Sequence, residues 1–318
     1  MSRTLNVLTF LNDAIGRGER CALVAIADLI GSASRARGSL MAVTETGEWC
    51  GSLSSGCLEA ALVGEARRVI ASGTTEILRI GQGSPLIDLR LPCGGGLDLL
   101  IVPEPDSRAI SLAVASLLRR QAVMLHLTRN GGVTCAQADC QAIAIWDGEE
   151  LVVRCNPSLR LHIVGHGDET SALARLAIAH GAEVFVHTPD VRLLECCRAL
   201  GCEVALMKTP GDCSILSPDL FSAAIVLFHD HDWEVEPLMR LLAKPCFLIG
   251  AMGSPQTHST RLKALRDAGA DAAAMARIVG PVGLIPSTRD PEMLALSVLA
   301  QVGAAWNEAN RRGFATGI

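Results

Sequence analysis

Cys57 is the residue whose type and position point most directly to chemistry. It follows Gly56 in a loop of small residues, directly before an amphipathic helix predicted over residues 58–70. A thiol at a helix N-terminus has a lowered pKa, and the resulting thiolate is a soft metal ligand and a sulfur acceptor. We therefore interpret Cys57 as a metal or sulfur contact and Glu59 as an acceptor for a ligand amine. The alternative for Cys57 is a buried, unreactive side chain.

Two further glycine-rich segments are candidates for contact with the same ligand. Cys93 precedes Gly94 and Gly95, which relieve steric crowding around its sulfur. Arg35 lies in the loop over residues 31–38, where small side chains allow close approach of the backbone and a guanidinium can bind an anion. The alternatives are a turn that leads into a strand, for the first segment, and a flexible loop without a ligand, for the second.

The second half of the chain contains part of a dinucleotide-binding motif. The segment Gly165–Gly167 follows a buried strand at residues 161–164 and precedes a helix at residues 169–179, which is the position of a Rossmann fingerprint. Thr170 stands where the third glycine of that fingerprint is expected. Phosphate binding at this helix N-terminus stays open, although the nearby carboxylates of Asp168 and Glu169 would repel the phosphate.

Two other features bear on ligand binding by the second half. An acidic residue normally follows the second strand and binds the NAD ribose, but His187 and Thr188 occupy that place and Asp190 comes later. His229 begins a stretch rich in His and Asp after the fourth predicted strand. This position at the carboxyl edge of a sheet suits a metal site or a proton relay. The alternative is a polar loop that caps the next helix at Asp232.

Strands and helices alternate through the second half. Strands are predicted at residues 161–164, 183–187, 203–207, 223–228 and 246–249. Helices are predicted at residues 169–179, 191–200, 233–242 and 257–268, and a final helix begins at Asp290-Pro291. Such alternation requires right-handed crossovers and a parallel sheet. The sequence therefore predicts a Rossmann-like, doubly wound C-terminal domain over residues 158–318.

The first half has a mixed pattern that is typical of an α+β domain. Helices are predicted at residues 4–14, 58–70 and 107–119. Strands are predicted at residues 21–27, 41–44, 48–52, 74–80, 97–102, 123–127, 142–146 and 151–153. Asn156-Pro157 is the predicted boundary, because proline restricts the residue before it and ends regular elements. The N-terminal domain is therefore expected to span residues 1–157.

Composition restricts the class of protein. A chain of 318 residues with 49% hydrophobic residues can form two packed cores, and a net charge of −5 indicates neither nucleic acid nor a membrane as a partner. Residues 1–20 lack the apolar core of a signal peptide, and apolar stretches of about six to ten residues are too short to span a bilayer. We therefore expect a cytoplasmic protein whose 12 cysteines are mostly free thiols.

Short motifs in order along nearly the whole chain resemble those of one known family. Residues 31–41 resemble its Gly-Ser-x-Pro-Arg-x-x-Gly-x-x-Met, residues 56–59 its Gly-Cys-x-Glu, and residues 93–95 its Cys-Gly-Gly. Later motifs of the family are similar to residues 165–167, 229–230, 250–254, 281–284 and 291–300. The chain thus resembles the xanthine dehydrogenase accessory family of the XdhC/CoxI type.

The resemblance implies a maturation factor rather than an enzyme. Family members bind the molybdenum cofactor (molybdopterin), help it to receive its terminal sulfur, and insert it into a xanthine dehydrogenase-type apo-molybdoenzyme. The resemblance also implies a cysteine desulfurase as a second partner, and a homodimer. Cys57 is expected to contact the metal, and no catalytic residue is assigned. The expected cofactor-binding residues are Arg35, Gly56, Cys57, Glu59, Cys93, Gly94, Gly95, Gly165, Gly167 and His229.

Two other functions remain open at this point. A Rossmann domain can serve an NAD(P)-dependent oxidoreductase, although Thr170 and Thr188 depart from the NAD pattern and the chain has no tyrosine for catalysis. The third interpretation is a protein-interaction scaffold with a vestigial ligand site. Binding of NAD(P) would favour the oxidoreductase, and binding of a molybdoenzyme without any small molecule would favour the scaffold.

Overall fold

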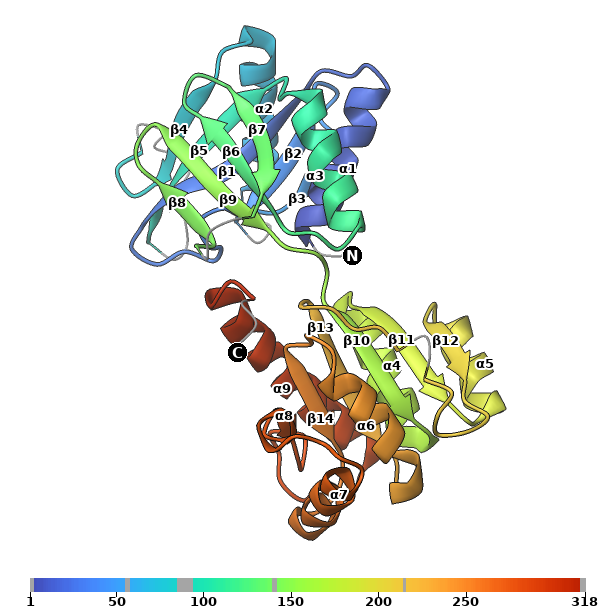
Figure 1. The fold of residues 1–318 in the computed structure, drawn as a ribbon. Coiled ribbons are helices and arrows are strands. Elements are labelled where there is room, and N and C mark those ends of the chain that lie inside the picture. Colours follow the sequence, from blue (N-terminus) through green and yellow to red (C-terminus); the bar gives the residue numbers. More distant parts are fainter. Residues whose placement is uncertain (1–2, 55–57, 85–93, 139–141, 214–215, 315–318) are drawn as a thin grey trace. The chain divides into compact units, whose positions relative to one another are not determined.

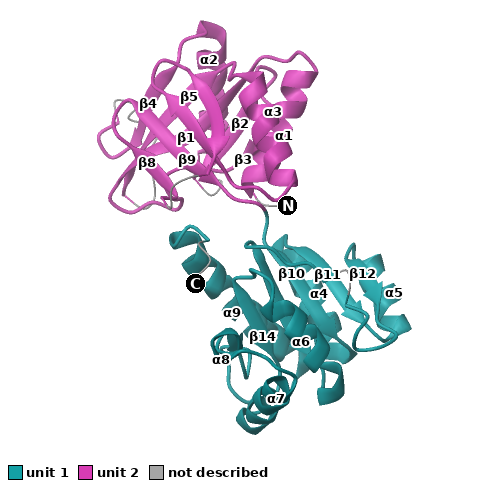
Figure 2. Cartoon of the chain, in the orientation of Figure 1, with its two compact units in different colours: residues 1, 158–318 teal, residues 2–157 magenta. Residues whose placement is uncertain are grey.

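The chain forms two compact units, one of residues 2–157 and one of residues 158–318 (Figure 2). The computed structural model describes residues 3–54, 58–84, 94–138, 142–213 and 216–314. Within these ranges no helix is long and apolar enough to cross a membrane. Each unit contains its own hydrophobic cores, so each buries the apolar surface that stabilises it.

The N-terminal unit is built on a five-stranded antiparallel sheet with the strand order β3-β2-β1-β5-β4. The central strand β1 pairs with both β2 and β5. Apolar residues occupy nearly every position of β1, because both faces of the sheet are covered. The strands are β1 (Cys21–Ile30), β2 (Leu40–Thr44), β3 (Trp49–Gly51), β4 (Glu76–Gly81) and β5 (Gly96–Pro103).

Helices and a second sheet cover the two faces of this central sheet (Figure 1). One face packs against α2 (Glu59–Ser72). The other face shares a core with α1 (Arg3–Gly16), α3 (Ser107–Leu118) and the second sheet. The second sheet is antiparallel, with the order β7-β6-β9-β8. Its strands are β6 (Val123–Thr128), β7 (Val133–Gln137), β8 (Ala144–Trp146) and β9 (Glu150–Cys155).

The C-terminal unit contains a six-stranded parallel sheet with the order β12-β11-β10-β13-β14-β15. This is the strand order of a Rossmann fold, in which the first and fourth strands are neighbours and later strands are added on the opposite side of the first strand. Here that switch point lies between β10 and β13. The strands are β10 (Arg160–Gly165), β11 (Glu183–Thr188), β12 (Glu203–Leu206), β13 (Ser222–Leu227), β14 (Leu248–Ala251) and β15 (Ile278–Val279).

Helices lie on both faces of the parallel sheet (Figure 1). One core contains residues of α4 (Gly167–His180), α5 (Val191–Ala199) and α9 (Pro291–Arg311). The core on the opposite face contains residues of α6 (Val235–Leu242), α7 (Pro255–Asp267) and α8 (Ala272–Met275). A short 3₁₀ turn, η1 (His231–Trp233), precedes α6. The doubly wound architecture and the α+β character of the first unit are confirmed.

The sequence analysis does not predict three short elements of the structure. They are β7, β15 and α8. β7 follows the turn at Asn130-Gly131 and exposes most of its side chains, so it carries no hydrophobic signal. β15 and α8 are too short to produce a periodic pattern. The sequence also predicts a helix from Trp233, whereas α6 begins at Val235 after the 3₁₀ turn.

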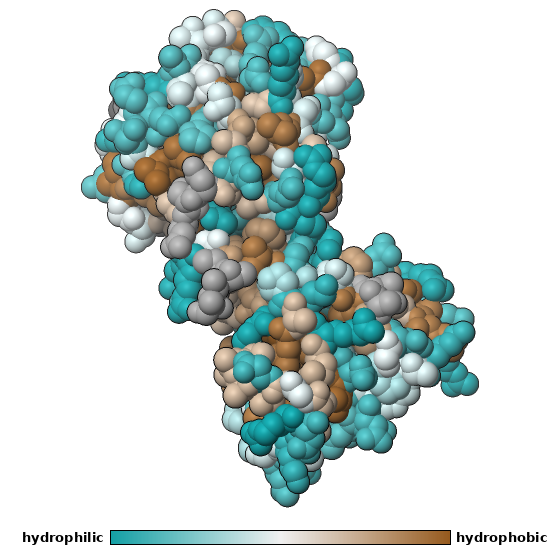
Figure 3. All heavy atoms as spheres, viewed as in Figure 1, coloured by the Kyte–Doolittle hydropathy of each residue, from teal (hydrophilic) through white to brown (hydrophobic). Residues whose placement is uncertain are grey.

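The surface of each unit is mixed. On the face shown in Figure 3, hydrophilic residues surround small hydrophobic areas in both units. The exposed large hydrophobic side chains of the N-terminal unit include Trp49 of β3, Leu112 and Leu118 of α3, and Ile145 of β8. They are spread over separate elements, which is usual for the surface of a globular protein.

Two buried histidines lie side by side on neighbouring strands of the parallel sheet. His162 of β10 and His187 of β11 are each 1% exposed, and His162 Nδ1 lies 3.3 Å from His187 Nε2. Their rings stack with a centroid distance of 5.6 Å. Burial lowers the pKa of His187 to about 4, because the charged imidazolium would lose its hydration. His187 is therefore neutral in the folded protein at neutral pH.

We predict that acid destabilises the C-terminal unit through His187. Its folded pKa lies below the unfolded value, so the unfolded chain binds the extra proton and stability falls as the pH drops from about 6.5 towards 4. Between pH 7.5 and pH 5 the loss is about 2 kcal/mol. Urea unfolding of the wild type at both pH values measures this loss. His187→Gln cannot take up the proton and should show a smaller pH dependence. His180→Gln, at an exposed histidine, is the control. An unchanged pH dependence in His187→Gln contradicts this assignment.

Candidate functional site

The first and third motif loops of the N-terminal unit lie against each other. β1 and β5 pair antiparallel with Ile30 opposite Gly96, so the loop that leaves β1 adjoins the segment that enters β5. A Cβ atom on Gly95 would lie 2.1 Å from the carbonyl oxygen of Ser32 and 2.8 Å from that of Ile30. Only glycine fits here, and its absent side chain allows the two loops to meet. Gly94, one residue earlier, is exposed and has open space around it.

Arg35 connects the first loop to the second. Its Nε donates a hydrogen bond of 3.2 Å to the backbone carbonyl of Ser52. No described residue accepts a hydrogen bond from the two terminal nitrogens of its guanidinium, and the side chain is half-buried. Arg35 is thus held at one nitrogen by the described residues, and its role in anion binding stays a prediction.

Glu59 organises the second loop from the first turn of α2. Its Oε1 accepts hydrogen bonds from the Ser52 hydroxyl at 2.7 Å and the Ser54 amide at 3.1 Å. Its Oε2 accepts from the Ser54 hydroxyl at 2.7 Å and the Leu58 amide at 3.3 Å. Each carboxylate oxygen therefore has two donors from the loop itself. Glu59 acts as a positioning residue in this structure, whereas the sequence analysis expects it to bind a ligand amine.

The pKa of Glu59 records this arrangement. Burial alone would raise it, since Glu59 is only 7% exposed, but the hydrogen bonds from Ser52 and Ser54 stabilise the anion and lower the pKa to about 2. The loop is also anchored at both ends, because Leu53 and Leu58 are buried in the core beneath α2. The loop is thus attached to the core by both apolar and charged contacts.

Three of the ten expected binding residues lie outside the described residues. They are Gly56, Cys57 and Cys93. Among the described ones, Arg35 and Glu59 both bind Ser52, Arg35 at its carbonyl and Glu59 at its hydroxyl. Gly95, which follows Gly94, packs against Ser32 in the loop that contains Arg35. The roles assigned to the two cysteines stay predictions.

A cavity of about 380 Å³ lies beside this junction in the N-terminal unit. Arg35 and Ser52 contribute to its wall, together with the first turn of α1. Sequence reasoning did not single out Ser52, Ser54 or Arg3, because isolated serines and a helical arginine carry no motif. A hydroxyl-rich run before Gly56 was the available signal for the two serines.

The remaining expected residues lie at the switch point of the parallel sheet in the C-terminal unit. A Cβ atom on Gly165 would lie 2.7 Å from the Leu227 carbonyl oxygen and 2.9 Å from Thr170 Oγ1, so glycine permits close packing of β10, β13 and α4. Gly167 follows at the start of α4. His229 Nε2 lies 3.7 Å from Glu169 Oε1. Glu169 and His229 line a cavity of about 910 Å³.

This crevice lacks the acid that binds a dinucleotide ribose. Thr188 and His187 at the end of β11 are buried, and the Asp190 carboxylate caps α5 by accepting from the amides of Arg192 and Leu193. Glu169 places a carboxylate in the first turn of α4, where a pyrophosphate would sit. The geometry of a Rossmann fold is present, but its charges do not match a dinucleotide.

The His- and Asp-rich stretch after β13 is used locally. Asp230 caps η1 by accepting from the Asp232 amide, so the cap is at Asp230 rather than at the expected Asp232. His231 Nδ1 lies 3.0 Å from Glu234 Oε2, and Glu234 also pairs with the buried Arg261 at 2.8 Å. In the described parts of the chain, no three His, Cys, Asp or Glu side chains are grouped to hold a metal ion.

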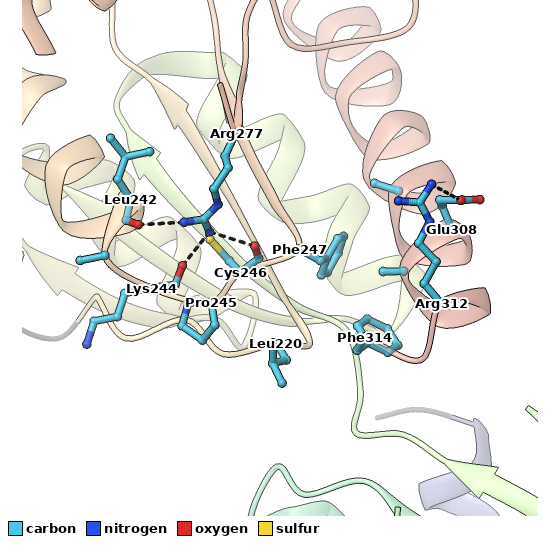
Figure 4. A pocket seen from close by; sticks show the side chains of 13 residues that line it. Leu220, Leu242, Lys244, Pro245, Cys246, Phe247, Arg277, Glu308, Arg312 and Phe314 are labelled. Atoms are coloured by element: carbon cyan, nitrogen blue, oxygen red, sulfur yellow. Dashed lines mark hydrogen bonds and ion pairs between the residues drawn. The ribbon is translucent and has the colours of Figure 1, made fainter. Parts of the chain in front are cut away.

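A third cavity, of about 550 Å³, lies in the C-terminal unit where the chain enters β13 and β14 (Figure 4). Its arginines already have partners. Arg277 donates to the carbonyl oxygens of Leu242, Lys244 and Cys246, at 2.8, 2.7 and 3.3 Å. Arg312 pairs with a Glu308 oxygen at 2.8 Å. Three basic side chains and the carboxylate of Glu308 thus line this cavity, with Lys244 as its exposed ammonium group.

The contact between Gly95 and Ser32 predicts a sharp difference between two neighbouring glycines. Gly95→Ala forces a Cβ atom against backbone and should destabilise the N-terminal unit by about 3 kcal/mol. Gly94→Ala meets only open space and the strain of its φ of 71°, and should cost about 1 kcal/mol. Urea unfolding of the two variants tests the difference, and equal losses would show that the loops do not meet as described.

Glu59→Gln should destabilise the protein at neutral pH and have little effect in acid. The folded pKa of about 2 lies below the usual 4.5, so the carboxylate contributes stability above pH 4.5 that is lost as the pH falls towards 2. The contribution is about 3 kcal/mol at pH 7. Urea unfolding at pH 7 and pH 2 measures it, with Glu65→Gln on the same helix as the control. A pH-independent difference would contradict the hydrogen-bond network.

Comparisons with known proteins agree with this architecture. The model of the XdhC Rossmann domain matches residues 161–302, and the model of the XdhC and CoxI family matches residues 14–81. The chain is 32% identical over 299 residues to the molybdenum cofactor insertion chaperone PaoD of Escherichia coli (strain K12), which covers 94% of this chain and 87% of that protein.

A solved structure has the same fold over almost the full length. It is described as a xanthine dehydrogenase from Bacillus halodurans, and it superposes with a TM-score of 0.75 over 97% of this chain and 96% of that chain. Its sequence identity of 21% supports the shared fold alone. The resemblance found in the sequence motifs is confirmed by the family models and by PaoD: the chain belongs to the XdhC and CoxI family.

Proposed function

We propose that this protein binds the molybdenum cofactor through its N-terminal unit and delivers it to an apo-molybdoenzyme of the xanthine dehydrogenase type. The observation that carries the proposal is the junction of motif loops in that unit, where Gly95 meets Ser32 and Arg35 binds the Ser52 carbonyl. The relationship to PaoD, a molybdenum cofactor insertion chaperone, supports the same function.

The chemistry of the cargo fits the residues at this junction. The cofactor carries a dithiolene, a pterin and a phosphate, so a carrier needs a soft contact, an anion contact and hydrogen-bonding groups. Arg35 has two guanidinium nitrogens that no described residue binds and that can contact an anion, and Cys57 and Cys93 are the proposed sulfur or metal contacts. Glu59 keeps the segment before Cys57 in place through Ser52 and Ser54.

The membership in the family suggests the roles of the two units, the oligomeric state and the source of the sulfur. The two structural units are functional domains, residues 1–157 and residues 158–318, and the first holds the cofactor. The protein acts in the cytoplasm as a homodimer and a non-enzymatic carrier. A cysteine desulfurase supplies the terminal sulfur of the cofactor. Gly165, Gly167 and His229 form a second contact region in the Rossmann unit, which carries an anion less readily because of Glu169.

An NAD(P)-dependent oxidoreductase is the second candidate function. The strand order of the parallel sheet and the large cavity at its switch point favour it, because nucleotides bind there in many Rossmann folds. The capping role of Asp190 and the carboxylate of Glu169 weigh against it. Calorimetric titration with NAD and NADP distinguishes the two functions.

We predict that the purified protein retains the cofactor and that Cys57→Ala abolishes this retention. The protein is mixed anaerobically with released molybdenum cofactor and desalted, and molybdenum and pterin are quantified. The wild type should retain both at near-stoichiometric levels, because a thiolate is a strong contact for a soft metal. Cys196→Ala, at an exposed thiol of the C-terminal unit, is the control and should behave as the wild type.

Each departure from this result has its own meaning. Full retention by Cys57→Ala would remove that residue from the site and leave the carrier function in place. No retention by the wild type, together with NAD(P) binding, would favour the oxidoreductase. Retention without activation of an apo-xanthine dehydrogenase in a reconstitution assay would contradict the proposed client.

A further inference from the structure

The cavity beside the motif loops has a wall composition that differs from the other two. It is formed by the first turn of α1, the loop after β1 and the end of β3. Two arginines and several neutral polar groups face it, and no carboxylate is among its lining residues. The lining residues are Arg3, Thr4, Asn6, Val7, Arg35, Ser39, Leu40, Cys50, Gly51 and Ser52.

Close packing at Gly51 brings the walls of this cavity together. A Cβ atom on Gly51 would lie 2.7 Å from the Leu40 carbonyl oxygen and 2.9 Å from a methyl group of Val7. The φ of Gly51 is 101°, a value that other residues rarely adopt. The end of β3 can therefore approach both α1 and β2, and Arg3 and Arg35 come to line one cavity although they are far apart in sequence.

The cationic groups of this cavity are available. Arg3 is exposed, and no hydrogen bond or ion pair of its side chain with another described residue is recorded. Arg35 uses only its Nε, on the Ser52 carbonyl. Burial raises the pKa of the Cys50 thiol, so this side chain is neutral and does not repel an anion. The cavity thus has an excess of positive charge.

Each of the two other cavities has a carboxylate in its wall. In the cavity at the switch point of the parallel sheet, Glu169 contributes a carboxylate beside His229. In the cavity of Figure 4, Arg277 is bound to backbone carbonyls and Arg312 to Glu308. Of these three cavities, the one lined by Arg3 and Arg35 combines two cationic side chains with a wall that contains no carboxylate.

We propose that this cavity binds a phosphate monoester, with Arg3 and Arg35 as its cationic contacts, and that this phosphate is the one carried by the molybdenum cofactor. The inference rests on the proposed function for the identity of the ligand. A guanidinium presents paired N–H donors that match two phosphate oxygens, and the hydroxyls of Thr4 and Ser39 line the same space. Arg3 is then a binding residue that no motif indicates.

The test compares the cofactor with its dephosphorylated form. Affinities of the full-length protein for both are measured anaerobically by ultrafiltration, for the wild type, Arg3→Gln and Arg108→Gln. Arg108 is an exposed arginine in the first turn of α3 that does not line the cavity, so its substitution removes the same charge elsewhere. Arg3→Gln should weaken binding of the phosphorylated cofactor about tenfold. It should leave the dephosphorylated form unaffected, and Arg108→Gln should change neither.

Equal weakening of both forms by Arg3→Gln would overturn the phosphate assignment, and no weakening of either would remove the cavity from the site. A second probe, inorganic pyrophosphate, tests the cavity without the cofactor. It should raise the melting temperature of the wild type and of Arg108→Gln but not of Arg3→Gln. If the wild type binds no cofactor yet shows this pattern, the proposed function fails and the phosphate site stands. If pyrophosphate stabilises Arg3→Gln as much as the wild type, the cavity is not a phosphate site.

Discussion

The buried carboxylate of Glu59 is the interaction on which the N-terminal candidate site depends. Burial of an anion is costly unless its lone pairs accept hydrogen bonds, and here four donors from Ser52, Ser54 and Leu58 supply them. If the loop moved away, the buried carboxylate would lose these hydrogen bonds. Ser52 also receives Arg35 at its carbonyl, so the position of the guanidinium depends on the same carboxylate.

The fold was largely predictable because both units bury their strands and helices on regular faces. In the C-terminal unit, the short apolar strands separated by amphipathic helices required a parallel sheet, and the sheet has the Rossmann order. In the N-terminal unit the hydrophobic strand at β1 was equally clear. The sequence did not predict β7, because its exposed side chains follow no apolar period and its pairing with β6 depends on the turn at Asn130-Gly131.

The candidate site was predictable in its members more than in their roles. Arg35, Glu59 and Gly95 stand in recognisable motifs, but a motif does not say which groups will surround a side chain. Glu59 contacts its own loop, and Gly95 is required by the Ser32 carbonyl across the sheet, which no local pattern indicates. Arg3 comes to the site only through packing at Gly51, a contact between α1 and β3 that sequence spacing does not reveal.

The charges of the two units explain why a familiar fold need not supply the binding site. The Rossmann unit has the strand order and the glycine at Gly165, yet Glu169 stands at the helix N-terminus and Asp190 is used as a helix cap. The carboxylate of Glu169 repels a phosphate, and the use of Asp190 as a cap leaves the ribose of a dinucleotide without its usual acidic partner. In the N-terminal unit the cavity beside the motif loops is lined by Arg35, whose terminal nitrogens have no acceptor among the described residues, and by no carboxylate. The proposed binding of an anionic cofactor by the less familiar fold rests on this difference, because local charge and geometry, rather than topology, determine binding.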